Sequence, residues 1–146
     1  MLKVKDIMSI EVITLTPEDT LKTARKIMRL AHIRHLPIVD PCSRFCGLIT
    51  HRDILSATVS QLAGIDNATQ EEIDAGIPIR EVMRQDTQVV TGEEPLTKVA
   101  ETLLTNKYGC LPVVEHDKLI GIVTEADFIK LAIRLMENQE QASPQV

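Results

Sequence analysis

The sequence predicts a mixed α/β (α+β) protein built from two copies of one β-α-β-β-α unit. Two observations predict it: the chain partly overlays itself after a shift of 75 residues, and each copy alternates β-rich runs with apolar residues at helical spacing. The whole chain has 146 residues, the length of one ordinary domain. Copies of about half that size are rarely stable alone, so we expect them to pack on each other.

Few residues are identical between the two copies, but the matching runs occur in the same order in both. Three pairs of runs match, with one single-residue gap: Val4–Met8 with Ile79–Met83, Leu36–Asp40 with Leu111–Glu115, and Gly47–Asp53 with Gly121–Asp127. We divide the chain into a first repeat (1–56), a helical connector (57–78), a second repeat (79–137) and a flexible tail (138–146).

Each copy opens with a β-rich run, Glu11–Leu15 or Thr87–Val90, that predicts a strand. A helix is expected next, with Thr16 as its cap, Pro17 in its first turn and acidic residues close behind. In the connector, Thr69–Glu72 has the T-x-x-E pattern of a capping box and predicts the start of a short helix.

The second half of each copy predicts a β-hairpin and a second helix. Short apolar runs separated by polar turn residues give the strands, and a threonine, Thr50 or Thr124, begins the helix. The expected strands are Leu36–Val39 with Phe45–Ile49, and Leu111–Val114 with Lys118–Val123.

Composition excludes several classes of function. A net charge of −5 without a basic run argues against nucleic-acid binding, and no apolar run is long enough for a membrane span. Three cysteines, an odd number, indicate reduced thiols, and the N-terminus has no signal-peptide pattern, so we expect a cytoplasmic protein. No phosphate-binding loop or dinucleotide fingerprint occurs.

The pattern Gly-h-h-Thr-x-x-Asp, where h is apolar, occurs at the same place in both copies, Gly47–Asp53 and Gly121–Asp127. It has two interpretations. The threonine and aspartate can form a capping box that satisfies free amides of the following helix. They can also form a sugar and phosphate site, in which the aspartate accepts from ribose hydroxyls and the hydroxyl meets a phosphate oxygen.

These features together resemble a tandem pair of CBS domains, also called a Bateman module, over residues 3–135. The matching motifs are Asp6–Met8 and Glu81–Met83, the strand–Thr–Pro opening, His35–Val39 and Leu111–Val114, and the two Gly-h-h-Thr-x-x-Asp runs. The resemblance implies two halves packed through their sheets about a pseudo-twofold axis. It also implies adenosine nucleotides in the clefts between them, often a homodimer, and a regulatory role without catalytic residues.

The resemblance implies that Thr50 and Asp53 hold ribose and phosphate in a first cleft. Basic side chains surround this pair, as a phosphate chain requires: Arg34, His35, His51 and Arg52. The opposite, adenine-binding wall comes from Thr91, Leu96, Tyr108, Gly109 and Cys110. The expected ligand is AMP, ADP or ATP, with S-adenosylmethionine or NAD as alternatives.

A second cleft would use Thr124 and Asp127, with Thr16, Leu21 and Ile33 on its other wall. It departs from the first because Gly109, Cys110, Glu125 and Ala126 replace the four basic residues. The cleft is expected to be empty or to take a less charged adenosyl group.

Two other functions stay open. The chain can be a ligand-free dimerisation or scaffold module whose Thr/Asp pairs are only helix caps, or an enzyme acting through His51 or a thiol. Zinc on Cys42, Cys46 and nearby histidines is disfavoured because closed zinc sites use tighter cysteine pairs, so no metal is expected. With no output domain present, a sensor would act on a separate partner protein.

Overall fold

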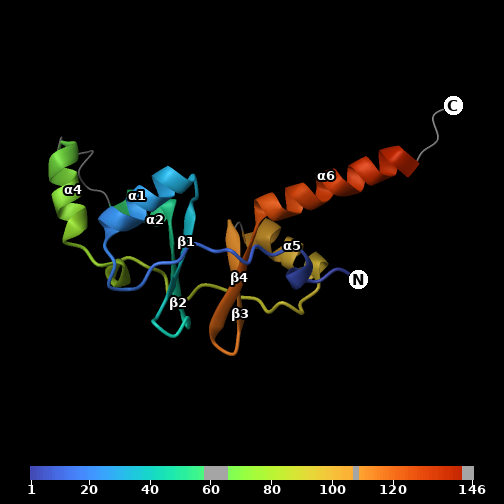
Figure 1. Cartoon of the computed structure of the whole chain (residues 1–146), viewed down its shortest axis with the longest axis horizontal. Helices are drawn as coiled ribbons and strands as arrows, with labels where there is room; N and C mark the ends of the chain where they lie inside the picture. Colours follow the sequence, from blue (N-terminus) through green and yellow to red (C-terminus); the bar gives the residue numbers. More distant parts are fainter. Residues whose placement is uncertain (58–65, 107–108, 143–146) are drawn as a thin grey trace. The chain divides into compact units, whose positions relative to one another are not determined.

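The computed structural model describes residues 1–57, 66–106 and 109–142. Its elements are shown in Figure 1 and follow in chain order: η1 (Val4–Asp6), α1 (Leu21–Ala31), β1 (His35–Val39), β2 (Phe45–Thr50), α2 (His51–Ala57), α4 (Asn67–Ala75), η2 (Ile79–Glu81), α5 (Leu96–Asn106), β3 (Cys110–Glu115), β4 (Lys118–Thr124) and α6 (Glu125–Ala142). The mixed α/β class is confirmed.

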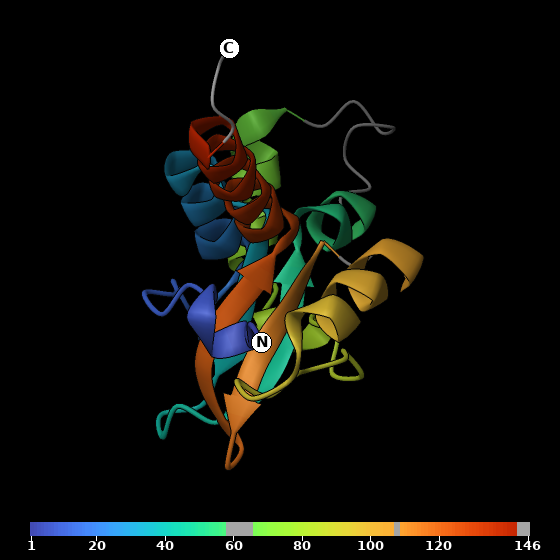
Figure 2. The same ribbon diagram turned by 90° about the vertical axis from the view of Figure 1, so that its right-hand side faces the viewer.

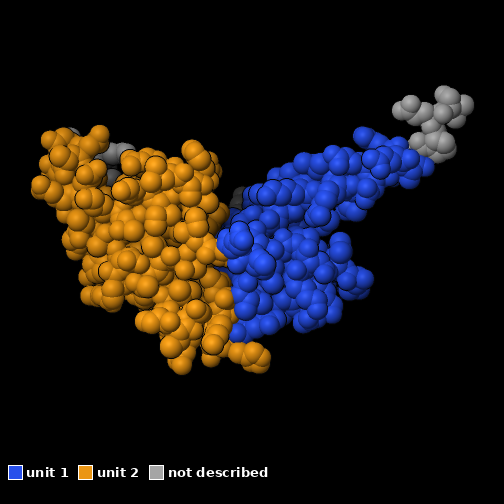
Figure 3. Space-filling view, in the orientation of Figure 1, with its two compact units in different colours: residues 1–11, 88–115, 120–146 blue, residues 12–87, 116–119 orange. Residues whose placement is uncertain are grey.

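Two compact units make up the chain, coloured separately in Figure 3. Unit 1 holds residues 1–11, 88–115 and 120–146, and unit 2 holds residues 12–87 and 116–119. Unit 1 therefore contains η1, although that segment opens the first repeat, and unit 2 contains η2, which opens the second. Each unit includes the opening segment of the other repeat's sequence.

The two hairpins form as predicted. In β1–β2 the antiparallel register pairs His35 with Thr50 and Ile38 with Gly47. The turn between these strands is fixed by Asp40, whose Oδ1 accepts hydrogen bonds from the backbone N–H groups of Cys42 and Arg44. Strands β3 and β4 form the second two-stranded sheet.

The predicted first strand of each copy is wrong. Only one residue of each run pairs with the hairpin: Leu15 bridges Ile38, and Val90 bridges Val113, both in parallel orientation. The cause is a proline in the neighbouring strand. In such a ladder, the amide of Pro37 or Pro112 would donate the next hydrogen bond, and proline has no N–H. Each strand therefore shortens to a single bridge.

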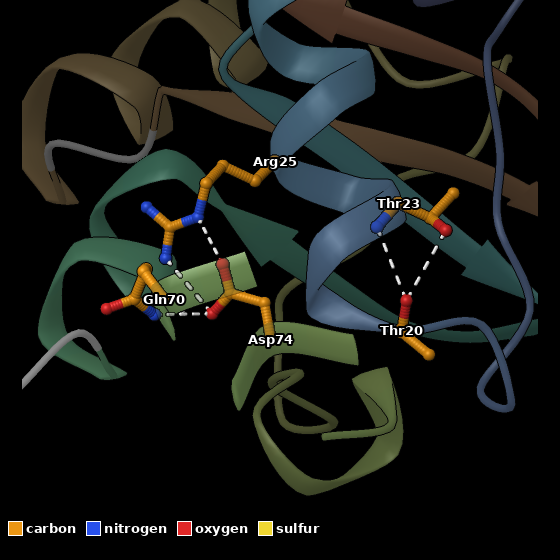
Figure 4. Close-up of polar contacts among 5 residues, drawn as sticks. All are labelled: Thr20, Thr23, Arg25, Gln70 and Asp74. Atoms are coloured by element: carbon orange, nitrogen blue, oxygen red, sulfur yellow. Dashed lines mark hydrogen bonds and ion pairs between the residues drawn. The ribbon is translucent and has the colours of Figure 1, made fainter. Parts of the chain in front are cut away.

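The first helix of each copy begins later than predicted, at Leu21 and Leu96. Thr16 does not cap α1, because its N–H and hydroxyl both donate to the carboxylate of Asp19 and close a turn. The cap is Thr20, whose hydroxyl accepts from the backbone N–H of Thr23 (Figure 4).

Each unit has its own aliphatic core. The buried residues of the two cores are Leu21, Ala24, Met28, Leu36, Ile38, Ile49, Ile54 and Ile79 in unit 2, and Val4, Val90, Leu96, Val99, Leu103, Leu111, Val113 and Val123 in unit 1. Val4 and Ile79 are fully buried. Because each comes from the opening segment of the other repeat, that segment is an integral part of the core it enters.

Backbone hydrogen bonds attach each opening segment in the same way. In unit 2, Leu48 and Arg84 exchange N–H···O bonds of 2.8 and 2.9 Å, and in unit 1, Ile122 and Ser9 do so at 2.9 and 3.0 Å. The approach is close enough to require glycine in the adjacent strand. A Cβ atom on Gly47 would lie 2.6 Å from the carbonyl oxygen of Arg84.

The same holds in unit 1, where a Cβ on Gly121 would lie 2.8 Å from the sulfur of Met8 and 2.9 Å from the carbonyl oxygen of Ser9. The leading glycine of each Gly-h-h-Thr-x-x-Asp run therefore has a packing role: it lets a third segment cross the hairpin.

Helix α4, in the connector, is attached to α1 by a buried carboxylate. Asp74 is 2% exposed and accepts hydrogen bonds from Arg25 Nε at 2.8 Å and Gln70 Nε2 at 2.7 Å (Figure 4). The predicted start of this helix at Thr69 is wrong, because Asp66 is the cap and accepts from the N–H of Thr69 at 2.8 Å.

Helix α6 leads directly from the end of β4 and continues without interruption (Figures 1 and 2). It extends to Ala142, so it includes the first residues of the predicted tail. Among the described helices, none combines the length and the apolar character needed to cross a membrane.

The glycine contact gives a first prediction. Gly47→Ala should lower the free energy of unfolding by about 1–3 kcal/mol, because the new methyl overlaps a backbone oxygen that cannot move without breaking the Leu48–Arg84 bonds. Gly76→Ala is the matched control: its Cβ meets only ordinary contacts, at 3.5 Å or more, so the change should stay under about 1 kcal/mol. Urea unfolding measures both, and equal effects would contradict the packing role.

The second prediction concerns the attachment of α4. Arg25→Ala should cost about 1–3 kcal/mol of unfolding free energy, since it removes a charged donor from a buried carboxylate. Arg80→Ala serves as the control, because Arg80 and its partner Glu18 are both exposed and such pairs contribute under about 1 kcal/mol. Thermal unfolding compares the two, and an Arg25→Ala protein as stable as Arg80→Ala would show that the pair does not hold α4.

Candidate functional site

The Thr50–Asp53 pair closes as a capping box at the start of α2. Asp53 Oδ2 accepts from the N–H and the hydroxyl of Thr50, both at 2.9 Å, and the N–H of Asp53 donates to Thr50 Oγ1 at 3.2 Å. The capping interpretation is therefore confirmed here. Asp53 is 7% exposed, and the cap leaves its second oxygen, Oδ1, for another partner.

The hairpin brings the predicted basic residues to this cap. His35 lies opposite Thr50 in the β1–β2 register, and the N–H of His51 donates to the carbonyl oxygen of Arg34 at 2.8 Å. The residues Arg34, His51 and Arg52 are exposed, and His35 is half-buried. Four basic residues thus lie next to the Thr50–Asp53 pair, two beside it in the sequence and two opposite it across the hairpin, all in unit 2.

A fifth basic residue, Arg84, is not apparent from the sequence as part of this site. Its Nε lies 2.7 Å from Asp53 Oδ1 and forms an ion pair with it. The hydrogen bond to Asp53 and the charge of that carboxylate raise the pKa of Arg84 above its already high ordinary value. Asp53 therefore has both oxygens engaged, one in the cap and one with the guanidinium. The sequence contains one indication of this difference: a shift of 75 residues aligns Arg84 with Ser9, so one repeat has a basic residue where the other has a neutral one.

The corresponding turn of unit 1 has the same backbone. Thr124 donates to Asp127 Oδ2 through its N–H at 2.8 Å and its hydroxyl at 3.3 Å, and Asp127 is 8% exposed. The N–H of Glu125 points to the carbonyl oxygen of Gly109 at 3.4 Å, as His51 does to Arg34. The overlay is thus confirmed at the level of individual hydrogen bonds.

The chemistry of the two turns differs. At the unit 1 positions that match the basic residues of unit 2, the side chains are neutral or acidic: Ser9, Gly109, Cys110, Glu125 and Ala126. Within the described residues, no ion pair reaches Asp127. The two sites therefore share a cap and differ in charge.

The other predicted contacts of the first cleft belong to unit 1. Thr91 is exposed and Gly109 is half-buried, whereas Leu96 and Cys110 are buried. Tyr108 lies outside the described residues. Because Thr50 and Asp53 belong to unit 2, the cleft that would combine both groups stays a prediction.

The second predicted cleft is divided in the same way, with Thr124 and Asp127 in unit 1 and its other wall in unit 2. Leu21 is buried in the unit 2 core, and Ile33 packs against that core while half-buried. Thr16 donates to Asp19 in the turn before α1. This cleft also stays a prediction.

The three cysteines differ in burial. Cys42 is exposed, Cys46 is half-buried, and Cys110 is buried. Burial raises the pKa of the Cys110 thiol to about 12. Burial, and to a smaller extent the negative charge of Asp40, also raises the pKa of the Cys46 thiol. A nucleophilic thiol needs a lowered pKa, so neither group is activated. In the described part of the chain, no cluster of three or more His, Cys, Asp or Glu residues is placed to hold a metal ion.

Comparison with known proteins identifies the family. The profile of the CBS domain matches twice, over residues 4–60 and 79–136, so each of the two copies seen in the sequence has one match. The chain belongs to the CBS domain family and carries a tandem CBS pair.

Solved structures of CBS pairs share this fold. A Vibrio cholerae protein named for acetoin utilization (AcuB) is 36% identical, with a TM-score of 0.81 and 99% of each chain covered. The CBS pair of protein MJ0100, in complex with 5′-methylthioadenosine and S-adenosyl-L-methionine, is 30% identical, with a TM-score of 0.73 over 92% of this chain and 98% of the other. CBSX2 in complex with AMP is 23% identical, with a TM-score of 0.79 over 93% and 99%.

CBS pairs also occur within longer enzymes. This chain is 29% identical to an inosine-5′-monophosphate dehydrogenase of Methanocaldococcus jannaschii, matching 88% of this chain but only 23% of the dehydrogenase.

The burial of the cysteines gives a third prediction. With a disulfide reagent at pH 8, Cys42 should react first, and Cys110 should react roughly a thousandfold more slowly, because at a pKa of about 12 almost none of it is thiolate. Absorbance of the released reagent thiolate measures this. Cys42→Ser should remove the fast phase and Cys110→Ser should leave it. A fast phase that depends on Cys110 would contradict the buried position.

Proposed function

We propose that this CBS pair is a regulatory module that binds an adenine nucleotide, AMP, ADP or ATP, at the Thr50–Asp53 turn of its first repeat. The observation that carries the proposal is the gathering of Arg34, His35, His51 and Arg52 around this turn. A phosphate chain needs basic side chains around it, and a helix cap alone does not. The two relatives solved with AMP or with adenosyl ligands support an adenosine moiety as the common part of the ligand.

The proposed roles follow the predicted first cleft. Asp53 accepts from ribose, Thr50 and the basic residues meet phosphate, and the adenine contacts Thr91, Leu96, Tyr108, Gly109 and Cys110. At the second repeat, Thr124 and Asp127 with Thr16, Leu21 and Ile33 take a less charged adenosyl ligand or none. S-adenosylmethionine and NAD are the alternative ligands.

Regulation would work through differential affinity. A ligand that binds one arrangement of the chain more tightly than another shifts the population towards it, and a separate partner protein responds. We propose that the chain acts as a cytoplasmic homodimer and has no catalytic step of its own.

The second candidate is a scaffold without a ligand. It is favoured by one observation: the Thr50–Asp53 pair already closes as a capping box, and Asp127 accepts from the N–H and the hydroxyl of Thr124, so the motif has a structural use in each repeat. A test of nucleotide binding therefore needs variants that keep the cap.

Asp53→Asn meets this need, because the amide oxygen can still accept from Thr50 while the negative charge is lost. In wild type, a hundredfold excess of AMP over its Kd should raise the melting temperature by about 5 °C or more. Asp53→Asn should bind AMP about tenfold more weakly, since the charged acceptor and its ion pair with Arg84 are both lost. Asp127→Asn is the matched control in the other repeat and should keep AMP binding.

A thermal-shift series with AMP, ADP, ATP, S-adenosylmethionine and NAD, followed by calorimetric titration, measures these effects. If no ligand stabilises wild type at millimolar concentration, the scaffold function replaces the sensor. If Asp53→Asn and Asp127→Asn weaken AMP binding equally, the assignment to the first repeat is wrong.

A further inference from the structure

The ion pair between Arg84 and Asp53 is a chemical difference between two turns whose backbones match, in addition to the four basic residues that the second turn lacks. Ser9 and Arg84 occupy equivalent positions: each exchanges two backbone hydrogen bonds with the strand residue that lies two positions before the capping threonine. The backbone is therefore the same in both repeats, and only the side chain differs.

Arg84 removes the net charge of the buried carboxylate. Asp53 is 7% exposed, and its Oδ1 receives the Arg84 Nε at 2.7 Å, so the pair as a whole is neutral. An unpaired carboxylate at this depth would repel a phosphate group placed a few ångströms away, because the interaction is weakly screened there.

Arg84 also has hydrogen-bond donors that the ion pair with Asp53 does not use. Its side chain is 60% exposed, and within the described residues it bonds to Asp53 through Nε. The four N–H groups on Nη1 and Nη2 lie beyond this contact, in the fork geometry that suits phosphate oxygens. One residue can therefore neutralise the ribose acceptor and add donors for an anion.

The unit 1 turn has neither feature. Ser9 carries no charge, Glu125 follows the capping threonine, and Asp127, 8% exposed, has no ion pair within the described residues. This turn contains a buried carboxylate, Asp127, and a second acidic residue, Glu125. Their negative charges disfavour a phosphate group and favour a neutral or cationic adenosyl group.

We propose that Arg84 is a specificity-determining residue of this protein: with the other basic residues it makes the Thr50–Asp53 turn select phosphate-bearing adenine ligands. The Thr124–Asp127 turn, which has Ser9 at the equivalent position, disfavours such ligands. The inference rests on the proposed nucleotide-binding function and adds the residue that sorts ligands by charge between the two repeats. Arg84 acts both through Asp53, as a positioning residue, and on the phosphate directly.

The test compares AMP with adenosine, which differ only in the phosphate, by calorimetric titration of the whole chain. Wild type should prefer AMP. Arg84→Gln keeps a donor for Asp53 without the charge and should reduce the ratio of the adenosine Kd to the AMP Kd about tenfold. Arg84→Lys keeps the charge without the fork and should hold that ratio within about threefold of wild type. Raising the salt concentration should weaken AMP binding to wild type more than to Arg84→Gln.

The reciprocal variant, Ser9→Arg, should create AMP binding at the second repeat, seen as an added binding site that Asp127→Asn removes. Melting temperatures establish that each variant is folded. Ser9 and Arg84 are both exposed, so neither substitution alters a core.

The outcomes separate this inference from the proposed function. Wild type that binds neither AMP nor adenosine overturns both. Wild type that binds AMP with a ratio unchanged in Arg84→Gln overturns the role of Arg84 alone. Tighter AMP binding by Arg84→Gln also overturns it, because Arg84 would then obstruct the carboxylate.

Discussion

The backbone hydrogen bonds between Leu48 and Arg84, repeated between Ile122 and Ser9, are the contacts on which each unit depends. They bring the opening segment of one repeat across the hairpin of the other. The approach is possible because the preceding strand residue is a glycine. With this segment in place, the apolar residue five positions earlier, Val4 or Ile79, is fully buried, so a core that one repeat could not complete is closed by the other's sequence.

The same contact assembles the candidate site. Leu48 precedes the capping Thr50 by two residues, so a side chain at the crossing position projects beside the buried Asp53. In unit 2 that side chain is Arg84, and in unit 1 it is Ser9. Because the backbone bonds need no particular side chain there, this position can change charge without loss of the fold. Stability and the proposed ligand chemistry are thus assigned to different atoms of one residue: the backbone holds the segment, and the side chain pairs with Asp53.

Much of the fold was predictable because it depends on local patterns. The hairpins follow from short apolar runs with polar turns, and the caps at Thr50 and Thr124 follow from the Thr-x-x-Asp spacing. The failures have long-range causes. The run before Leu15 has strand-forming residues, but Pro37 in another segment lacks the N–H that would extend the pairing. The delayed start of α1 reflects the turn closed by Asp19, which periodicity does not detect.

By itself the sequence determined the duplication, the mixed α/β class, the two hairpins and the basic residues that flank the first Thr/Asp pair. These depend on residues close together in the chain, where spacing fixes which side chains share a turn or a strand. Only the tertiary structure decided which opening segment enters which core, and that Arg84 meets Asp53 across 31 residues of sequence. Such a contact follows from how the segment crosses the hairpin, and neither local propensity nor periodicity encodes that crossing.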